Sequence, residues 1–303
     1  HSSHQAVRVM GRRYVNDPNP QGYVRKATRI GAYSFIGPHS VIAPGAQVGT
    51  GVNNQMSAMP SLHVGWAVLV AFAVIVASSS RWRWLVLAPH PDDFDTVAVT
   101  LRRFAAAGCD LWLDVLTGGA SGVEDAFVSG WDAKTAAREA EQRESCRIFG
   151  LADGRIRFHR FPEDGDGHML DNDGNADRVG AILDRAGPDG VILPHGNDSN
   201  ADHRRTARFF GRWAAGARRP LVALLVRDPK TLGMRLDLVV PFGAQEAERK
   251  AELLRCHRSQ HERNLRVRGH GLDARILEVN RAIAAEAGLV EPFAEGFEVS
   301  LIG

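Results

Sequence analysis

The chain has 303 residues, enough for one large domain or two smaller ones. Its composition, with 44% hydrophobic and 24% charged residues, excludes a wholly disordered chain and a protein with many membrane spans. The net charge of +2 hides an uneven distribution, because the first 83 residues carry about +7 and the remainder about −5. This asymmetry predicts a domain boundary near residue 83, and we expect no nucleic-acid partner.

Cysteine is sparse. The chain contains Cys109, Cys146 and Cys256, and no Cys-x-x-Cys pair. Three scattered cysteines provide no disulfide framework, which fits a reducing compartment. The N-terminal residues show no signal peptide pattern. We therefore expect a cytoplasmic protein.

The segment 1–55 carries a six-residue repeat. One aliphatic residue recurs at every sixth position, with small or turn-forming residues between: Val24, Ile30, Ile36, Ile42 and Val48. This period is typical of a left-handed parallel β-helix, and the segment resembles the hexapeptide-repeat acyltransferases. Five repeats make fewer than two coils, and a solenoid needs stacked neighbours to bury its inner face. We therefore expect a remnant of such a domain, in which His39 is the single candidate base.

The segment 56–83 contains an apolar run, 64–77, that follows the sequence Pro60-Ser61-Leu62-His63. This opening resembles the middle signature of the phosphatidic-acid-phosphatase-type membrane phosphatases, but the flanking motifs of that family are missing, so we expect no phosphatase activity. A membrane span needs roughly 20 apolar residues. Two interpretations stay open: weak membrane association through 59–84, where basic and tryptophan residues suit a membrane interface, and a buried helix.

From residue 84 to 303 the pattern alternates between strands and helices. Strands are predicted at 84–88, 111–116, 156–161, 191–193, 221–226, 236–240 and 297–302. Helices are predicted at 96–107, 132–149, 176–186, 201–214, 245–258 and 274–287, with Asp95 as an N-cap and Gly150 as a C-terminal stop. The predicted fold class is α/β, a Rossmann-like, doubly wound and mainly parallel sheet, preceded by a short β-helix-like segment and an apolar helix.

Two clusters of metal-ligating residues each follow a predicted strand. His90, Asp92 and Asp93 come directly after the first strand, and Asp202 and His203 come shortly after the fourth. Because parallel strands end at the same edge of a sheet, these side chains can converge there. Two imidazoles and a carboxylate with open positions for water are typical of a catalytic zinc site. A further carboxylate beside the metal suits a general base.

The residues from about 84 to 303 resemble the PIG-L/LmbE-like zinc-dependent N-acetylglucosaminyl deacetylases. The family's first motif, His-Pro-Asp-Asp-Glu, appears as His-Pro-Asp-Asp-Phe at residues 90–94. The second motif, His-Pro-Asp-His, appears as Asn-Ala-Asp-His at residues 200–203. Further family-like stretches follow in the same order along the chain, at 117–122, 138–150, 250–260 and 293–297.

The resemblance implies His90, Asp93 and His203 as ligands of Zn²⁺, or of another divalent metal, and Asp92 as the general base. Zinc lowers the pKa of a bound water toward about 7 and polarises the acetyl carbonyl. Asp92 would then take the proton of the water and pass it to the leaving amine. Asp202 would orient a ligand imidazole from behind.

This chain departs from the family pattern at two positions. Phe94 replaces a glutamate, so the supporting role of that carboxylate is either lost or moves to Asp95. Asn200 replaces a histidine that helps to stabilise the oxyanion in the family. An asparagine can still donate a hydrogen bond, and His195 can contribute. Asn200 and His195 are therefore further catalytic candidates.

The other polar residues are assigned supporting or surface positions. Asp198 is expected to stand behind the site rather than in it. The polar stretch 255–270 is expected at the surface, with its three histidines binding no metal. The arginines of this stretch, Arg263, Arg266 and Arg268, could meet an anionic substrate or face solvent.

The sequence therefore predicts a zinc-dependent hydrolase that removes an N-acetyl group from an N-acetylglucosamine-type sugar or conjugate. Its expected partner is a small acylated amino-sugar substrate. Two alternatives stay open. One is a non-catalytic metal-binding domain, and the other is a fusion of an acyltransferase with a deacetylase. The predicted domains are 1–55, 56–83 and 84–303.

Overall fold

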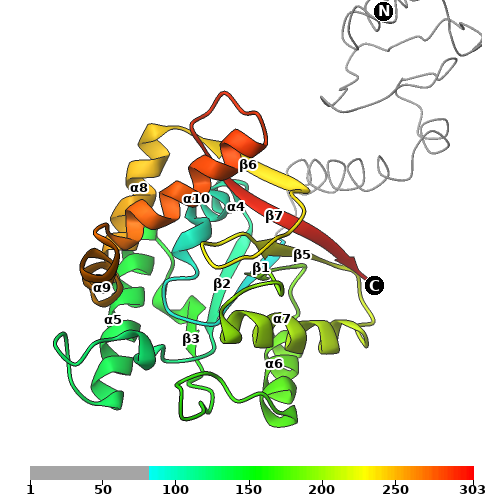
Figure 1. Ribbon diagram of the computed structural model, residues 1–303. Helices are drawn as coiled ribbons and strands as arrows, with labels where there is room; N and C mark the ends of the chain where they lie inside the picture. Colours follow the sequence, from blue (N-terminus) through cyan, green and yellow to red (C-terminus); the bar gives the residue numbers. More distant parts are fainter. Residues whose placement is uncertain (1–81) are drawn as a thin grey trace, which may run out of the picture. The chain divides into compact units, whose positions relative to one another are not determined.

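The computed structural model describes residues 82–303 (Figure 1). The predicted hexapeptide-like segment 1–55 lies outside the described residues, as does the predicted apolar helix at 64–77, so both stay predictions. No helix within residues 82–303 has the length and hydropathy needed to cross a membrane.

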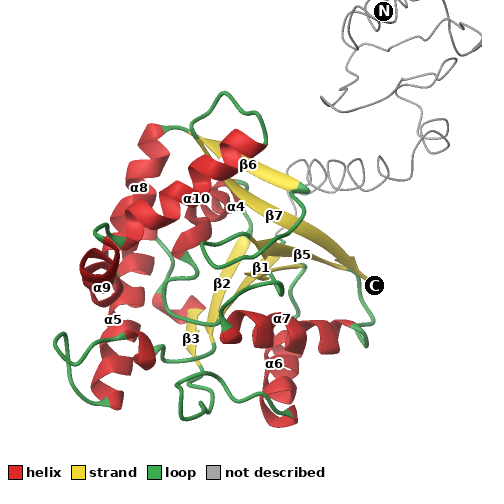
Figure 2. Ribbon diagram, viewed as in Figure 1, coloured by secondary structure: helices red, strands yellow, loops and turns green. Residues whose placement is uncertain are grey.

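Residues 82–303 form a sheet of seven strands (yellow in Figure 2). The strands are β1 (Arg83–Ala88), β2 (Asp110–Val115), β3 (Ile156–Phe158), β4 (Gly190–Pro194), β5 (Leu221–Val226), β6 (Leu238–Phe242) and β7 (Phe293–Ile302). Their order in the sheet is β3-β2-β1-β4-β5-β7-β6. The first five are parallel, whereas β7 pairs antiparallel with both β5 and β6. The predicted mainly parallel α/β fold is thereby confirmed.

Helices cover both faces of this sheet (Figure 1). They are α4 (Ala98–Ala106), α5 (Trp131–Phe149), α6 (Asp173–Ala186), α7 (Ala201–Ala214), α8 (Ala244–Arg255), α9 (Arg258–Arg268) and α10 (Leu272–Glu286). On one face, Leu87 of β1 belongs to the same buried cluster as Val179 of α6 and Phe209 of α7. On the other face, Trp84 of β1 stacks on Phe104 of α4 with ring centroids 4.4 Å apart. Both faces of β1 are therefore buried, which explains its unbroken apolar sequence.

Most predicted elements are present with shifted ends. Gly150 ends α5 in the left-handed conformation, with φ 97°, as expected for a residue without a side chain. Asp95 is not the N-cap of a helix, because it is the first residue of a short 3-10 turn that leads into α4. The helix α9 has no counterpart in the prediction, since its sequence lacks an apolar repeat and its buried residues are polar.

The strand order places a crevice beside β1. The chain leaves β1 toward β2 on one side, and it later returns to β4 on the other side of β1. In open α/β sheets, ligands bind where the strand order reverses in this way, beyond the carboxyl ends of the strands. The loops that follow β1 and β4 carry the two predicted motifs, so the topology brings those motifs together.

Candidate active site

The loop after β1 holds Asp92 in an unusual backbone conformation. Its φ is 109°, a region that side chains other than glycine rarely adopt. Two residues of α5 hold this loop: the Asp92 amide donates to Gln142 Oε1 at 2.9 Å, and Arg138 lies 3.2 Å from Asp92 Oδ1. Arg138 also donates to the carbonyl of Pro91. Strained residues of this kind concentrate at functional sites, and the surrounding bonds stabilise the strain.

The same loop is anchored by Asp95, which is fully buried. Ser145 Oγ donates to Asp95 Oδ1 at 2.5 Å, and Nε2 of His257 lies 2.6 Å from Asp95 Oδ2. Phe94 is buried as well, and it packs edge-on against Phe149. A carboxylate one position further along therefore supports the loop in place of the family's glutamate. The predicted surface position of His257 is wrong, because the imidazole is buried behind this loop.

The loop after β4 leads into α7, and three polar residues at this junction line the neighbouring pocket. Asn200 caps the helix, since its Oδ1 accepts the amide of Asp202 at 2.8 Å. Asp202 and His203 then lie in the first turn of α7 and are both buried. The cap leaves the NH₂ group of Asn200 without a role in the helix, and Asn200 lines the neighbouring pocket.

His90, Asp93 and His203 meet as one cluster of candidate metal ligands. His90 Nδ1 lies 3.6 Å from Asp93 Oδ2, and His203 Nε2 lies 3.6 Å from Asp93 Oδ1. One ligand atom from each of the three residues lies within 4.8 Å of the other two. The structure therefore brings the three predicted ligands together.

Carboxylates occupy the other nitrogen of each ligand imidazole. Nε2 of His90 lies 2.9 Å from Asp202 Oδ2. Nδ1 of His203 lies 3.1 Å from Asp198 Oδ2 and 3.2 Å from Asp228 Oδ2. This arrangement leaves His90 Nδ1 and His203 Nε2 as the nitrogens that face Asp93, and a metal would bind them once they have lost their protons. Metal-binding histidines usually have such a carboxylate partner, so these residues fit a zinc ion.

A second cluster of candidate ligands consists of Asp198, His203 and Asp228. It uses the opposite nitrogen of His203, and Asp198 does not line the pocket. Asp228 is also engaged elsewhere, since its Oδ1 accepts the amides of Lys230 and Thr231. The first cluster lines the pocket with all three residues, so it is the better candidate for a metal that must reach a substrate.

These contacts change the acid–base properties of the site. Burial alone lowers the pKa of His203, but its bonds to Asp198 and Asp228 outweigh that effect and raise the pKa to about 10. Burial likewise opposes charge on Asp202, yet the two hydrogen bonds from His90 and His168 hold its pKa well below the usual range. In the metal-free protein, a proton therefore competes with a metal for His203.

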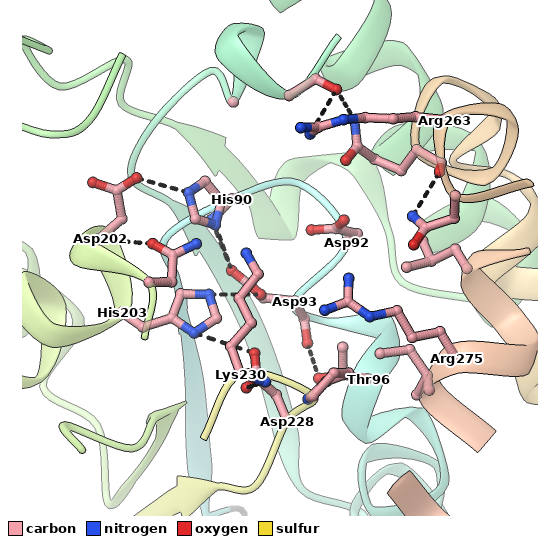
Figure 3. Close-up of a pocket in the computed structure, with 18 of the residues that line it drawn as sticks. His90, Asp92, Asp93, Thr96, Asp202, His203, Asp228, Lys230, Arg263 and Arg275 are labelled. Carbon is pink, nitrogen blue, oxygen red and sulfur yellow. Dashed lines mark hydrogen bonds and ion pairs between the residues drawn. The ribbon is translucent and has the colours of Figure 1, made fainter. Parts of the chain in front are cut away.

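The cluster opens into a pocket of about 360 Å³ (Figure 3). Asp92, Asp93, His90 and His203 are all among its lining residues. The other side chains that line it include Thr96, Arg138, His168, Asn200, Asp202, Asp228, Lys230, Gln260, Arg263, Asn264 and Arg275. The pocket is therefore polar, and it has a carboxylate, a candidate metal site and several hydrogen-bond donors within reach of one ligand.

Two histidines differ from the sequence-based expectation. His195, predicted as a catalytic candidate, does not line the pocket, because its Nδ1 accepts the amide of Asn197 and its Nε2 faces Glu298 at 3.5 Å. His168, which the sequence analysis did not single out, lines the pocket and places Nδ1 3.0 Å from Asp202 Oδ2. It lies in a loop after β3 without a recognisable motif, so only the fold shows its position.

Two family models match this chain. The PIG-L model, described as GlcNAc-PI de-N-acetylase, matches residues 85–214. A model of the PAP2 superfamily matches residues 22–91, of which the structure describes 82–91. That match agrees with the phosphatase-like signature noted before the apolar run. A search of curated proteins finds no match.

Several solved structures share the fold. The N,N'-diacetylchitobiose deacetylase of Pyrococcus horikoshii is 19% identical and has a TM-score of 0.62, covering 77% of this chain and 92% of its own. A deacetylase of teicoplanin biosynthesis is 18% identical with a TM-score of 0.58, and the match covers 72% of this chain and 98% of the deacetylase. GalB, a 4-carboxy-2-hydroxymuconate hydratase of Pseudomonas putida, is 17% identical with a TM-score of 0.56, and the match covers 72% of this chain and 95% of GalB.

Because one of these proteins is named as a hydratase, the shared fold does not by itself select a reaction. The family match is more specific, since it spans the two motif loops and both candidate ligand histidines. The resemblance of this chain to the PIG-L family, inferred above from its motifs, is thereby confirmed over residues 85–214.

Proposed function

We propose that residues 84–303 act as a zinc-dependent hydrolase that removes the N-acyl group of an amino sugar or an amino-sugar conjugate. The observation that carries the proposal is the meeting of His90, Asp93 and His203 in the same pocket as Asp92. The match to a de-N-acetylase family and the likeness to two proteins named as deacetylases support it. The substrate class is therefore a small acylated amino-sugar.

Asp92 is positioned to move a proton. When bound, a metal such as Zn²⁺ supplies Lewis acidity, which acidifies a water molecule and polarises an acyl carbonyl. Arg138 engages Oδ1 of Asp92, so Oδ2 stays available to accept the proton of the attacking water. As the C–N bond breaks, Asp92 returns this proton to the nitrogen. The products are a free amine and a carboxylic acid, and the carboxylate of Asp92 is regenerated.

Two further side chains can contact the acyl group. The NH₂ group of Asn200 can donate to the acyl oxygen, because the cap of α7 uses only its Oδ1. The imidazole of His168 is oriented by the bond between its Nδ1 and Asp202, which leaves Nε2 for a substrate. We assign Asn200 to stabilising the developing negative charge. His168 can share this role as an imidazolium, because only then does its Nε2 carry a hydrogen to donate. We assign no catalytic role to His195.

The test is an amine-release assay on the zinc-loaded full chain with N-acetylglucosamine and N,N'-diacetylchitobiose. The Asp92→Asn variant is expected to lose about 10²- to 10⁴-fold in kcat while its zinc content is unchanged. Asp177→Asn is the control, because Asp177 is an exposed aspartate on α6 that does not line the pocket. Full activity in the Asp92 variant, or in protein stripped of divalent metal, would overturn the proposal.

The same assay separates the alternatives. Bound zinc with no amine released from any acylated substrate would favour a non-catalytic metal-binding domain. A fusion of an acyltransferase with a deacetylase depends on segment 1–55, which lies outside the described residues, and it stays a prediction.

A further inference from the structure

Three cationic side chains line the pocket in addition to Arg138. Lys230 comes from the loop after β5, Arg263 from α9 and Arg275 from α10. In Figure 3, Arg275 points toward Asp92, and Lys230 reaches toward His90 and Asp93. The cations therefore come from three elements that are separate in sequence, and they share one pocket with the candidate metal ligands.

None of these three cations has a carboxylate partner within 4.0 Å among the described residues. The guanidinium of Arg263 donates one hydrogen bond, to the carbonyl of Gly122 at 3.3 Å, and the guanidinium of Arg275 has no hydrogen-bond partner in residues 82–303. Other arginines of the same region are paired. Arg255 lies 2.7 Å from Asp273, and Arg266 forms an ion pair with Glu124. Arg258 and Arg268 of α9 also have no carboxylate within 4.0 Å among the described residues, but they do not line the pocket. The pocket cations are therefore distinguished by the missing partner together with their position in the pocket.

The carboxylates near these cations are already engaged. Asp92 pairs with Arg138 at 3.2 Å. Asp228 accepts two loop amides through Oδ1 and faces His203 through Oδ2. Neither carboxylate has an oxygen within 4.0 Å of a guanidinium nitrogen of Arg275, so neither is its direct partner.

The surroundings of Arg275 make an anionic ligand favourable. Arg275 is half-buried, and the apolar side chains Leu254, Leu272 and Ile276 line the pocket with it. Burial, together with repulsion from Arg268 and Arg263, lowers the pKa of Arg275 and outweighs the attraction to Asp228 and Asp92, although a guanidinium remains charged at neutral pH. A partly desolvated charge without a partner is unfavourable, and an ion pair formed there is screened less than one at the surface.

We propose that Arg275, assisted by Lys230 and Arg263, binds an oxyanion group of the substrate. The planar guanidinium of Arg275 can hold a carboxylate or a phosphate through two parallel hydrogen bonds, whereas Lys230 adds a point charge. This inference deepens the proposed function, on which its substrate rests: the N-acyl group lies at His90, Asp93 and His203, and the anionic group lies beside α10. The substrate class is then an acidic acylated amino sugar.

The test is equilibrium binding, measured by calorimetry, of three sugars that lack an N-acyl group: glucose, glucuronate and glucose 6-phosphate. Using these sugars makes the result independent of any deacetylation. Each sugar is titrated into the zinc-loaded full chain and into the same chain after chelation of the zinc. Comparing the two states separates anion binding by the metal from anion binding by the arginines. We expect at least one anionic sugar to bind about tenfold or more tightly than glucose in both states. The two anionic sugars distinguish a carboxylate from a phosphate.

Substitutions show which residues cause the preference for an anionic sugar. Arg275→Met is expected to abolish the preference for an anion, Lys230→Met to reduce it, and Arg275→Lys to restore part of it. Arg268→Met is the matched control, because Arg268 is exposed on α9 and does not line the pocket. Thermal unfolding shows whether each variant is folded. If Arg275→Met does not fold, Arg275→Lys still tests the site, because it keeps the charge but loses the paired hydrogen bonds of the guanidinium.

Equal binding of all three sugars by the unmodified chain would overturn the anion subsite. So would an anion preference that survives both Arg275→Met and Lys230→Met. Neither outcome affects the amine-release assay, which can still support the proposed hydrolase activity. Conversely, a negative amine-release assay does not change the result of the sugar-binding measurement. The two proposals can therefore fail separately.

Discussion

His90 Nε2 lies 2.9 Å from Asp202 Oδ2, although 112 residues separate the two in sequence. This bond joins the loop after β1 to the first turn of α7, and it determines which nitrogen of His90 faces Asp93. Asp202 also accepts a bond from His168, so one buried carboxylate orients both a candidate metal ligand and a pocket imidazole. The relationship between His90 and Asp202 is therefore the basis for the first prediction.

Replacing Asp202 with asparagine should weaken metal binding. The amide still fills the space but carries no charge, so it stabilises the required tautomer of His90 less well. We expect zinc affinity to fall by about 10- to 100-fold, measured by competition with a chromophoric chelator. Asp177→Asn, an exposed change on α6, is the control and should leave the affinity unchanged. Equal affinities in both variants would contradict the prediction.

Metal affinity should rise with pH. The pKa of His203 is raised to about 10 in the metal-free protein, so its imidazole is protonated at neutral pH, and, although burial opposes the charge, hydrogen bonds to carboxylates raise the pKa of His90 as well. A metal binds only the neutral imidazole, and each proton released makes the affinity rise about tenfold per pH unit. Zinc dissociation constants at pH 6, 7 and 8 test this expectation. A constant affinity across that range would show that these imidazoles are already neutral.

The backbone at position 92 should be strained whenever the residue there has a side chain. Asp92→Ala and Asp92→Gly both lose the contact with Arg138, so they differ mainly in how they tolerate a φ of 109°. We expect the glycine variant to be more stable than the alanine variant by about 1 kcal/mol, after allowing for the greater freedom of glycine when unfolded. Urea unfolding of the two full-length variants measures the difference. A more stable alanine variant would show that the strain is absent.

The fully buried ion pair between Lys250 and Glu295 should be costly to break. Lys250 Nζ lies 2.7 Å from Glu295 Oε1, and Glu295 also accepts the amides of Val99 and Thr100 at the start of α4. Lys250→Met leaves a buried carboxylate unpaired, so we expect a loss of about 3–5 kcal/mol in the free energy of unfolding. Adding Glu295→Gln should recover part of this loss, because it removes the uncompensated charge.

The surface pair of Lys134 and Asp125 is the control for this measurement. Asp125 is largely exposed, with 79% of its side chain accessible. Lys134→Met should therefore change the free energy of unfolding by no more than about 1 kcal/mol. Similar losses in the two lysine variants would show that burial does not strengthen the inner pair.

His168 should contribute to turnover without holding the metal. Its Nδ1 is bonded to Asp202, and the residue lines the pocket outside the ligand cluster. We expect His168→Ala to lower kcat by about 10- to 100-fold and to leave zinc content unchanged, whereas His270→Ala should leave kcat unchanged. A change confined to KM would instead assign His168 to substrate binding.

The sequence predicted the sheet well and one helix not at all. Fully apolar strands such as β1 and β4 stand out because both of their faces are buried. The helix α9 escaped prediction because its buried residues, Ser259, Gln260 and Asn264, are polar. Ser259 is held by hydrogen bonds to Glu141 rather than by apolar packing. Hydrophobic periodicity carries no information about such a helix.

By itself, the sequence determined where the candidate site lies. Parallel strands end at one edge, so the motifs after β1 and β4 were expected to converge, and His90, Asp93 and His203 do meet. Only the tertiary structure decided which nitrogen of each imidazole faces inward, that His195 lies outside the pocket, and that Arg275 lies inside it. These outcomes depend on the directions of side chains from distant segments, which local sequence patterns do not encode.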